Sequence, residues 1–220
     1  MKLSERLEAV ASFIDQDNSI IDVGCDHALL DIYLIKNNMV KRAVASDNKQ
    51  GPLDQAILNI KGENLENKII VSRANGIDKL DDLTDTVVIS GMGGLNMIGI
   101  MKYAYDKIPQ IKKIVLSPNN EVAKVRKEFV ELGYYIEKET LVKDHGVIYP
   151  VISFKQGKAH YKKKDYLFGP LLRLEKSPLF KELNEREIQQ REVLLPLLPK
   201  KYWWRKLELQ KEIKNRIKER

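Results

Sequence analysis

One stretch of this chain, from Ser19 to Leu30, constrains the fold more than any other. A short apolar run ends there at Asp22 and Gly24, and a helical periodicity of apolar residues starts at Ala28. This pattern is typical of a buried parallel strand that turns at a glycine and continues as a helix. Glycine lets a ligand approach the backbone closely, and the first amides of a helix have no intrahelical partner. The stretch therefore predicts either a nucleotide-binding turn or an ordinary strand-to-helix turn.

A second apolar run, residues 42–47, favours the nucleotide-binding interpretation. It ends in Asp47, 23 residues after Gly24, and Asn48 follows it. That spacing is close to the one at which an acidic side chain binds the two ribose hydroxyls of a nucleoside. Two strand ends are then expected to face the same nucleoside.

The residues of the turn argue against a dinucleotide. A dinucleotide-binding turn has glycine at two further positions, where this chain has Asp26 and Leu29. A carboxylate at the phosphate position repels an anion and attracts a cation. S-adenosylmethionine carries an adenosine, a positively charged sulfonium and no phosphate. The sequence therefore favours S-adenosylmethionine over a nicotinamide dinucleotide as the cofactor.

Two further strand ends carry residues suited to adenosine. The run at 69–72 leads to Asn75 and Gly76, which either offer a hydrogen bond to the adenine edge and room for its ring, or form a plain Asn-Gly turn. The run at 86–90 is followed by a glycine-rich segment, which either opens a crevice or permits close packing of strand and helix. The predicted cofactor-binding residues are Asp22, Gly24, Cys25, Asp26, His27, Asp47, Asn48, Asn75, Gly76, Gly91, Met92 and Gly93.

The strand expected at 113–116 leads to residues beside the substrate. Pro118 has no backbone N–H, so its carbonyl and the amide of Asn119 are natural partners for the exocyclic amine of a flipped base, although Asn119 is equally suited to cap the next helix. Asp26 is expected to face the sulfonium and the cationic product, or only the amino-acid end of the cofactor. His27 is expected to orient the cofactor, approach the base or cap a helix. The predicted catalytic residues are Asp26, His27, Pro118 and Asn119.

The last two apolar runs, 134–142 and 147–154, complete the predicted fold. They flank a short connection with His145 at a solvated tip, so they are expected to pair antiparallel at the edge of an otherwise parallel sheet. The N-terminal helix is expected to be capped by Ser4 and to expose Arg6. The predicted fold class is α/β, a class I Rossmann-like methyltransferase domain with a seven-stranded, mostly parallel sheet, followed by a C-terminal α-helical hairpin.

Composition and charge bound the other expectations. Cys25 is the only cysteine in 220 residues, which excludes a disulfide and a cysteine-built metal site, and its thiol is expected to be packed rather than nucleophilic. No signal peptide or membrane-spanning run is visible, so a cytoplasmic location is expected. The net charge of +7 combines −3 in residues 1–154 with +10 in residues 155–220, which predicts two different functional surfaces.

The basic C-terminal part is predicted to bind a polyanion. We expect a cofactor-binding catalytic domain over residues 1–156 and a basic helical RNA-binding domain over residues 157–220, with a solvated coiled coil as the alternative. Prolines within 194–199 indicate the turn of a helical hairpin. Trp203 and Trp204 lie among lysines and arginines and are predicted either to pack within the hairpin, which aromatic burial favours, or to stack on RNA bases.

Together these motifs resemble one family across nearly the whole chain, the bacterial tRNA methyltransferases that form N1-methyladenosine at adenine 22. The resemblance implies a class I methyltransferase domain, S-adenosylmethionine as methyl donor and tRNA as the substrate held by the C-terminal domain. The chain departs from the family pattern at Asp31, where proline is usual, and at Asn75, where aspartate is commoner. The residues that carry the resemblance are Asp22-Val23-Gly24-Cys25-Asp26-His27-Ala28, Ser46-Asp47, Gly51-Pro52-Leu53, Asn75-Gly76, Gly91-Met92-Gly93-Gly94, Pro118-Asn119 and Phe168-Gly169-Pro170.

The residues alone leave three alternatives open. An N6-adenine RNA or DNA methyltransferase would use a similar Pro-Asn turn. A nicotinamide-binding oxidoreductase is disfavoured by Asp26. A non-catalytic RNA-binding module would depend on the basic C-terminal part for every activity. The sequence predicts no metal and no membrane contact, indicates no protein partner, and leaves the oligomeric state open with a monomer as the simplest expectation.

Overall fold

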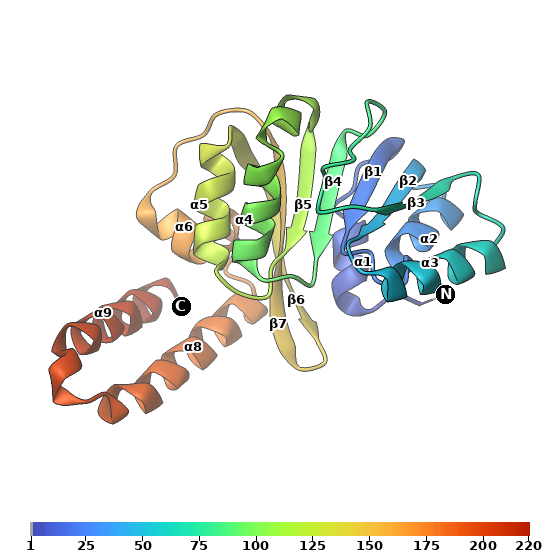
Figure 1. The fold of residues 1–220 in the computed structure, drawn as a ribbon. Coiled ribbons are helices and arrows are strands. Elements are labelled where there is room, and N and C mark those ends of the chain that lie inside the picture. The colour runs from blue at the N-terminus through green and yellow to red at the C-terminus, as the bar shows by residue number, and fades with distance from the viewer. Residues whose placement is uncertain (1) are drawn as a thin grey trace.

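A computed structural model describes residues 2–220, and within them seven strands form one sheet in the order β3-β2-β1-β4-β5-β7-β6 (Figure 1). Strands β1 to β5 run parallel, and β7 is antiparallel to both of its neighbours, β5 and β6. The predicted fold class is confirmed. The strands are β1 (Asn18–Val23), β2 (Val40–Asp47), β3 (Ile69–Arg73), β4 (Thr86–Ser90), β5 (Lys113–Ser117), β6 (Tyr134–Asp144) and β7 (Val147–Gln156).

Helices cover both faces of the sheet because the central strands are apolar on both sides. Ile20 of β1 packs in the cluster formed with α1, α2 and α3, whereas its neighbour Ile21 packs in the cluster formed with α4 and α5. Successive side chains of a strand point to opposite faces, so an uninterrupted β-branched run requires cover on both. The covering helices are α1 (Glu5–Ala11), α2 (Leu29–Lys36), α3 (Gln50–Gly62), α4 (Gly94–Tyr103) and α5 (Val122–Glu131).

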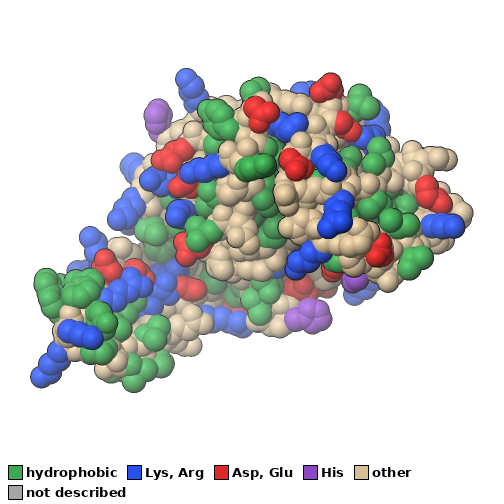
Figure 2. Space-filling model, in the orientation of Figure 1, with side chains coloured by type: hydrophobic (Ala, Val, Ile, Leu, Met, Phe, Trp, Pro, Cys, Tyr) green, Lys and Arg blue, Asp and Glu red, His purple; other side chains and the backbone are tan. Residues whose placement is uncertain are grey.

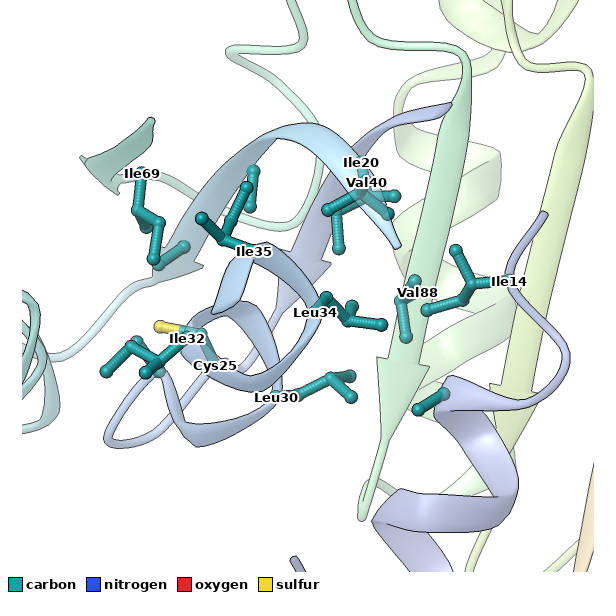
Figure 3. Packing of buried hydrophobic residues seen from close by; sticks show 14 of the residues in the cluster. Ile14, Ile20, Cys25, Leu30, Ile32, Leu34, Ile35, Val40, Ile69 and Val88 are labelled. Atoms are coloured by element: carbon teal, nitrogen blue, oxygen red, sulfur yellow. The ribbon is translucent and has the colours of Figure 1, made fainter. Parts of the chain in front are cut away.

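The first cluster includes the lone cysteine. Cys25 is 6% exposed and lies near Ile32 of α2, as Figure 3 shows. Burial raises the pKa of the Cys25 thiol, and nearby carboxylates, Asp22 first among them, raise it further. Because the thiolate is the nucleophilic form, this confirms the expectation that Cys25 is a packed side chain.

The edge hairpin turns through two residues, His145 and Gly146, both with positive φ (46° and 81°). Positive φ at both central positions is the geometry of a type I′ turn, whose twist matches that of the paired strands. The His145 side chain is 93% exposed, so the expected solvated tip is confirmed. At the other end of the hairpin, β7 runs to Gln156, which places the start of the predicted polar linker within the strand.

The C-terminal part is helical, as predicted (Figure 1). The pair α8–α9 forms an antiparallel hairpin that projects from the body of the molecule, with its tip at the lower left of the figure. Pro196 lies in the last turn of α8 and does not end the helix before it. The remaining helices are the short 3₁₀ segments η1 (Tyr105–Gln110) and η2 (Lys200–Tyr202), with α6 (Lys163–Phe168), α7 (Pro170–Glu175), α8 (Pro178–Leu197) and α9 (Trp203–Glu219).

A buried ion pair anchors α6 and α7 to the sheet domain. Arg126 Nε of α5 lies 2.6 Å from Glu139 Oε1 of β6, and both side chains are at most 3% exposed. The same two side chains bond the backbone of the helices: Arg126 donates to the carbonyl of Tyr166, and Glu139 accepts from the amide of Leu171. Gly169 lies between them with φ of 88°, and a Cβ there would come within 2.9 Å of both side chains. This explains the glycine of the Phe168-Gly169-Pro170 motif.

Two negative observations concern the described residues only. In the part of the chain from residue 2 onward, no helix combines the length and apolar character that a membrane crossing requires. The same residues contain no group of three or more histidine, cysteine or acidic side chains arranged to hold a metal ion.

Asp31, the departure in α2, is fully buried, and neither of its carboxyl oxygens has a hydrogen-bond partner within residues 2–220. Burial, and secondarily the nearby Asp22, raises the pKa of Asp31 well above its usual value. The folded protein therefore keeps a proton on Asp31 at a pH where the unfolded chain has lost it. Stability contributed in this way is greatest below the unfolded pKa of about 4 and falls as the pH rises toward the folded pKa.

We therefore expect Asp31→Asn to remove part of the pH dependence of stability. The free energy of unfolding of the variant, relative to the original chain, should grow with pH above about 4, with a slope of at most about 1.4 kcal/mol per pH unit. Urea unfolding between pH 4 and 8 measures this difference. Asp54→Asn, the same substitution at an exposed position on α3, is the matched control. Parallel curves for Asp31→Asn and the original chain would contradict the assignment.

Candidate active site

A cavity of about 690 Å³ lies at the carboxyl ends of β1, β2, β3 and β4, within the range of about 300–1,000 Å³ typical of small-molecule sites. In an open α/β sheet this edge is where ligands bind. Many of the predicted cofactor-binding residues line it, namely Gly24, Asp26, Asp47, Asn48, Asn75, Gly76 and Met92. The structure adds lining residues that were not predicted, namely Val23, Lys49, Pro52, Ala74, Leu95, Asn96, Gly99, Ile100 and Tyr103.

The turn after β1 is held against the end of β2. The amides of Gly24 and Cys25 both donate to the carbonyl of Ser46, at 2.8 and 3.1 Å. Gly24 has φ of 75°, and a Cβ there would lie 2.2 Å from Cε of Met92. The backbone conformation therefore favours glycine here, and the end of the Met92 side chain lies against it. Asp26 also has a positive φ (51°), and its side chain is 70% exposed at the cavity.

Asp22 is buried at the end of β1, next to this turn, and does not line the cavity. It is 5% exposed, and burial together with the neighbouring Asp47 raises the pKa of Asp22 to about 7. Cys25 also lies beneath the turn, in the apolar cluster. Of the predicted cofactor-binding residues, Asp22 and Cys25 are thus buried beneath the turn and do not line the cavity.

The ends of β2 and β3 face the cavity as predicted. Asp47 Oδ1 accepts a hydrogen bond of 2.9 Å from the amide of Lys49, which orients the carboxylate. Asn75 is exposed, and Gly76 has φ of 64°. A Cβ on Gly76 would lie 2.5 Å from Cγ2 of Ile100, so the glycine also permits α4 to approach this turn.

The glycine-rich loop after β4 and the Pro-Asn turn after β5 are bonded to each other. The amide of Gly91 donates to the carbonyl of Ser117 (3.2 Å), Nδ2 of Asn119 donates to the carbonyl of Gly91 (2.6 Å), and the amide of Asn119 donates to the carbonyl of Met92 (2.9 Å). The amide of Gly94 donates to Oδ1 of Asn120 at 3.0 Å. We define these residues, 91–94 and 117–120, as the paired loops.

The paired loops bear on three predictions. The backbone amide of Asn119 is already bonded to Met92, so it does not face a base, and contact of the side-chain amide with the base stays a prediction. Asn119 does not cap α5 either, because the N-cap residue is Glu121, in the left-handed region with φ of 53°. Gly91 and Gly93 do not line the cavity; Gly93 lies against Asn120, and Gly94 packs so tightly that a Cβ would be 2.6 Å from the Asn120 carbonyl. Close packing therefore accounts for part of this glycine cluster.

His27 lies beside the cavity without lining it. Its Nε2 is 3.6 Å from Oδ1 of Asp26, and its side chain is 47% exposed. The helix-capping role is wrong, since the N-cap residue of α2 is Ala28 and has no side-chain cap. The His27 carbonyl instead accepts a hydrogen bond from Asn59 of α3.

Arg6 of α1 is a further site residue that the sequence did not predict. It was predicted to face solvent, yet it is 9% exposed and bonds both Ser117 and Asn119. Its spacing from Leu3 and Val10, three and four residues away, places it on the buried face of α1. That periodicity is the signal that could have identified it.

The cavity suits an adenosyl sulfonium. The cavity is lined by two carboxylates, Asp26 and Asp47, and by one cation, Lys49. A positively charged ligand is therefore favoured over one that carries phosphates. Gly24 and Gly76 let Met92 and Ile100, which also line the cavity, approach the two turns closely. The residues present therefore fit S-adenosylmethionine.

The family model described as TrmK, tRNA (adenine(22)-N(1))-methyltransferase, matches residues 20–219. The chain is 28% identical over 196 residues to the tRNA (adenine(22)-N(1))-methyltransferase of Bacillus subtilis, covering 86% of this chain and 82% of that protein.

Two similar solved structures contain the cofactor or its product. A Streptococcus pneumoniae protein in complex with S-adenosyl-L-methionine superposes with a TM-score of 0.92 at 29% identity, covering 99% of each chain. TrmK of M. capricolum in complex with S-adenosyl-homocysteine superposes with a TM-score of 0.89 at 29% identity, covering 99% of this chain and 97% of that chain.

Proposed function

The chain belongs to the tRNA (adenine(22)-N(1))-methyltransferase family, and we propose that it methylates N1 of adenine 22 in tRNA with S-adenosylmethionine bound in the cavity at the ends of β1 to β4. The observation that carries this proposal is the acidic, glycine-lined cavity beside the Pro118–Asn119 turn. Family membership assigns the N1 position, which the residues alone left open against N6, and a methyl donor rather than a nicotinamide. A non-catalytic role is excluded on the same ground. We place the enzyme in the cytoplasm; that it acts as a monomer stays a prediction.

We propose the following roles in cofactor binding. Asp47, whose Oδ1 is held by the Lys49 amide, keeps Oδ2 for the ribose hydroxyls. Asn75 and Gly76 bind the adenine edge and admit its ring. Asp26 faces the sulfonium end, where its negative charge attracts the cation. Met92 lies along the ligand, in contact with the turn at Gly24.

The chain's own contribution to the reaction is alignment and charge. Bound S-adenosylmethionine supplies an electrophilic methyl group. The paired loops and the turn at Gly24 exclude water and align adenine N1 in line with that methyl group. N1 becomes cationic when it is methylated, and the carboxylate of Asp26 offsets this charge or takes a proton from the exocyclic amine.

Incubation with labelled S-adenosylmethionine and total tRNA tests the activity directly. We expect label in tRNA at adenine 22, as N1-methyladenosine, identified by nucleoside mass spectrometry before and after alkaline rearrangement to the N6 isomer. Label that is N6-methyladenosine from the start, or at another nucleotide, would contradict the proposal.

Asp26→Ala is expected to reduce kcat far more than cofactor affinity. We predict a loss of at least about 100-fold in kcat, because a stabilising charge beside the reacting atoms is removed, and a change of less than about tenfold in the dissociation constant of S-adenosylmethionine. Single-turnover methylation and calorimetry measure the two. Asp54→Ala, on the exposed side of α3, is the control. Equal losses in both quantities would reduce Asp26 to a binding residue.

We propose that residues 157–220 bind the tRNA and residues 1–156 the cofactor. The interpretation of both tryptophans as packed within the hairpin is wrong, since Trp203 is 64% and Trp204 49% exposed. With Tyr202 they form edge-to-face pairs with centroids 5.4 and 6.4 Å apart. Lys200 and Lys201 precede them, and Figure 2 shows the apolar and basic side chains gathered on this projecting end. Exposed aromatics among cations suit stacked bases and phosphates.

A second cavity, of about 620 Å³, supports this path for the RNA. It extends from Asn119 of the paired loops to α8 and α9. Arg191, Arg205 and Arg216 line it, partly neutralised by Glu187 and Glu212. We therefore propose that a run of tRNA nucleotides lies between the hairpin and the Pro118–Asn119 turn.

Replacing both tryptophans, Trp203→Ala with Trp204→Ala, should weaken tRNA binding by about tenfold or more, because a stacked base contributes roughly 1–3 kcal/mol. The KM for tRNA should rise while kcat at saturating tRNA and cofactor affinity stay unchanged. Tyr105→Ala, an exposed aromatic of η1 on the sheet domain, is the control. Unchanged tRNA affinity in a filter-binding titration would show that the tip makes no RNA contact.

A further inference from the structure

Arg6 is the second residue of α1, and all three nitrogens of its guanidinium donate hydrogen bonds to the turn after β5. Its Nε donates to Oγ of Ser117 at 2.7 Å, its second nitrogen donates to Oδ1 of Asn119 at 2.8 Å, and its third donates to the carbonyl of Ser117. The guanidinium carbon lies 3.9 Å from the ring centroid of Tyr149 on β7. Three elements distant in sequence therefore meet at one side chain.

Burying the Arg6 cation costs more free energy than a purely structural contact at this place requires. Arg6 is 9% exposed and forms no ion pair within residues 2–220. Burial lowers the pKa of Arg6, while Tyr149 and Asp144 act in the opposite direction. Burying an arginine without a carboxylate partner costs more than burying an apolar side chain in the same place. The other buried arginine of the sheet domain, Arg126, is paired with Glu139.

The two partners of Asn119 determine which way its side-chain amide points. A guanidinium only donates hydrogen bonds, so the atom facing Arg6 must be the oxygen, Oδ1. The carbonyl of Gly91 only accepts, so the atom facing it must be the nitrogen, Nδ2. Both requirements select the same orientation, and each bond strengthens it. Without Arg6, the Oδ1 atom would lose the partner that holds this rotamer.

We propose that Arg6 is the positioning residue of Asn119: it holds the Asn119 side chain, and through it the paired loops, in the conformation that receives the target adenine. This rests on the proposed function, because it assigns a role in the same site. Asn119 keeps one N–H and one lone pair for the base, and Oδ1 bonded to a cation is a weaker acceptor for the exocyclic amine of adenine. In this conformation the Asn119 side chain aligns the adenine ring rather than activating its exocyclic amine. This agrees with methylation at N1.

A double-mutant cycle between Arg6→Gln and Asn119→Ala tests the proposal. Arg6→Gln is expected to lower kcat by about 10- to 100-fold, as misplacement of an aligning group does. The dissociation constant of S-adenosylmethionine, measured by calorimetry, should change by less than about twofold. Adding Arg6→Gln to Asn119→Ala should lower kcat no further, because residues that act through one another are not additive. Arg6→Lys, which keeps one donor for Oδ1, should recover part of the lost rate.

Arg42→Gln is the matched control, because Arg42 bonds Asp81 and Thr84 near the opposite ends of the strands. It should lower the melting temperature and leave kcat unchanged. Three outcomes overturn the proposal: an unchanged kcat for Arg6→Gln, a double variant whose loss is the product of the two single losses, or an unchanged kcat for Asn119→Ala.

A measurement without turnover separates this proposal from the proposed function. In ¹⁵N-labelled protein without tRNA, the side-chain amide resonances of Asn119 should shift in Arg6→Gln and stay in place in Arg42→Gln. If the original chain failed to methylate tRNA while these resonances shifted, the proposed function would fail and the coupling of Arg6 to Asn119 would stand. Unshifted Asn119 resonances in Arg6→Gln would overturn the coupling itself.

Discussion

The hydrogen bonds between the loops that follow β4 and β5 are the constraint on which the rest of the site depends. Parallel strands end without a hairpin, so the segments after them leave the ladder of strand hydrogen bonds and need other partners. Here Gly91 bonds Ser117, Asn119 bonds Gly91 and Met92, and Asn120 bonds the start of α4. The cavity wall, the start of α4 and the turn proposed to receive the base are consequently one unit, and Met92 links that unit to the turn at Gly24.

Charge separates the two working surfaces of the molecule. The cavity has the carboxylates of Asp26 and Asp47 at its edge, which favours a cationic cofactor. Residues 155–220 carry a net charge of +10, which favours a polyanion. The buried pair Arg126–Glu139 gives the helical part a fixed origin on the sheet domain, because both side chains also bond the backbone around Gly169. The hairpin carries its exposed aromatic tip away from the sheet domain.

The sequence by itself determined the strands and the turns that line the cavity at their carboxyl ends. Apolar runs of β-branched residues must be buried, and glycine or short polar residues at their ends mark where a parallel sheet meets a ligand; both are local signals. For that reason Gly24, Asp47, Asn75 and Gly76 were correctly predicted to lie at one cavity, and their contact with the cofactor stays a prediction. Asp26 in the same turn favoured S-adenosylmethionine over a nicotinamide dinucleotide, and the family resemblance added the tRNA substrate and the N1 position.

Only the tertiary structure decided which polar side chains bond each other across the fold. Arg6 is 111 residues from Ser117, and no local pattern reports that a cation will be buried against the turn containing Asn119. Asp31 lies within a helix and is fully buried in the fold, which the periodicity of the sequence cannot distinguish from a solvated position. The tryptophans are exposed because the projecting hairpin has no neighbouring element near its tip to cover them. Burial and long-range hydrogen bonds depend on which elements become neighbours, and that is a property of the folded chain alone.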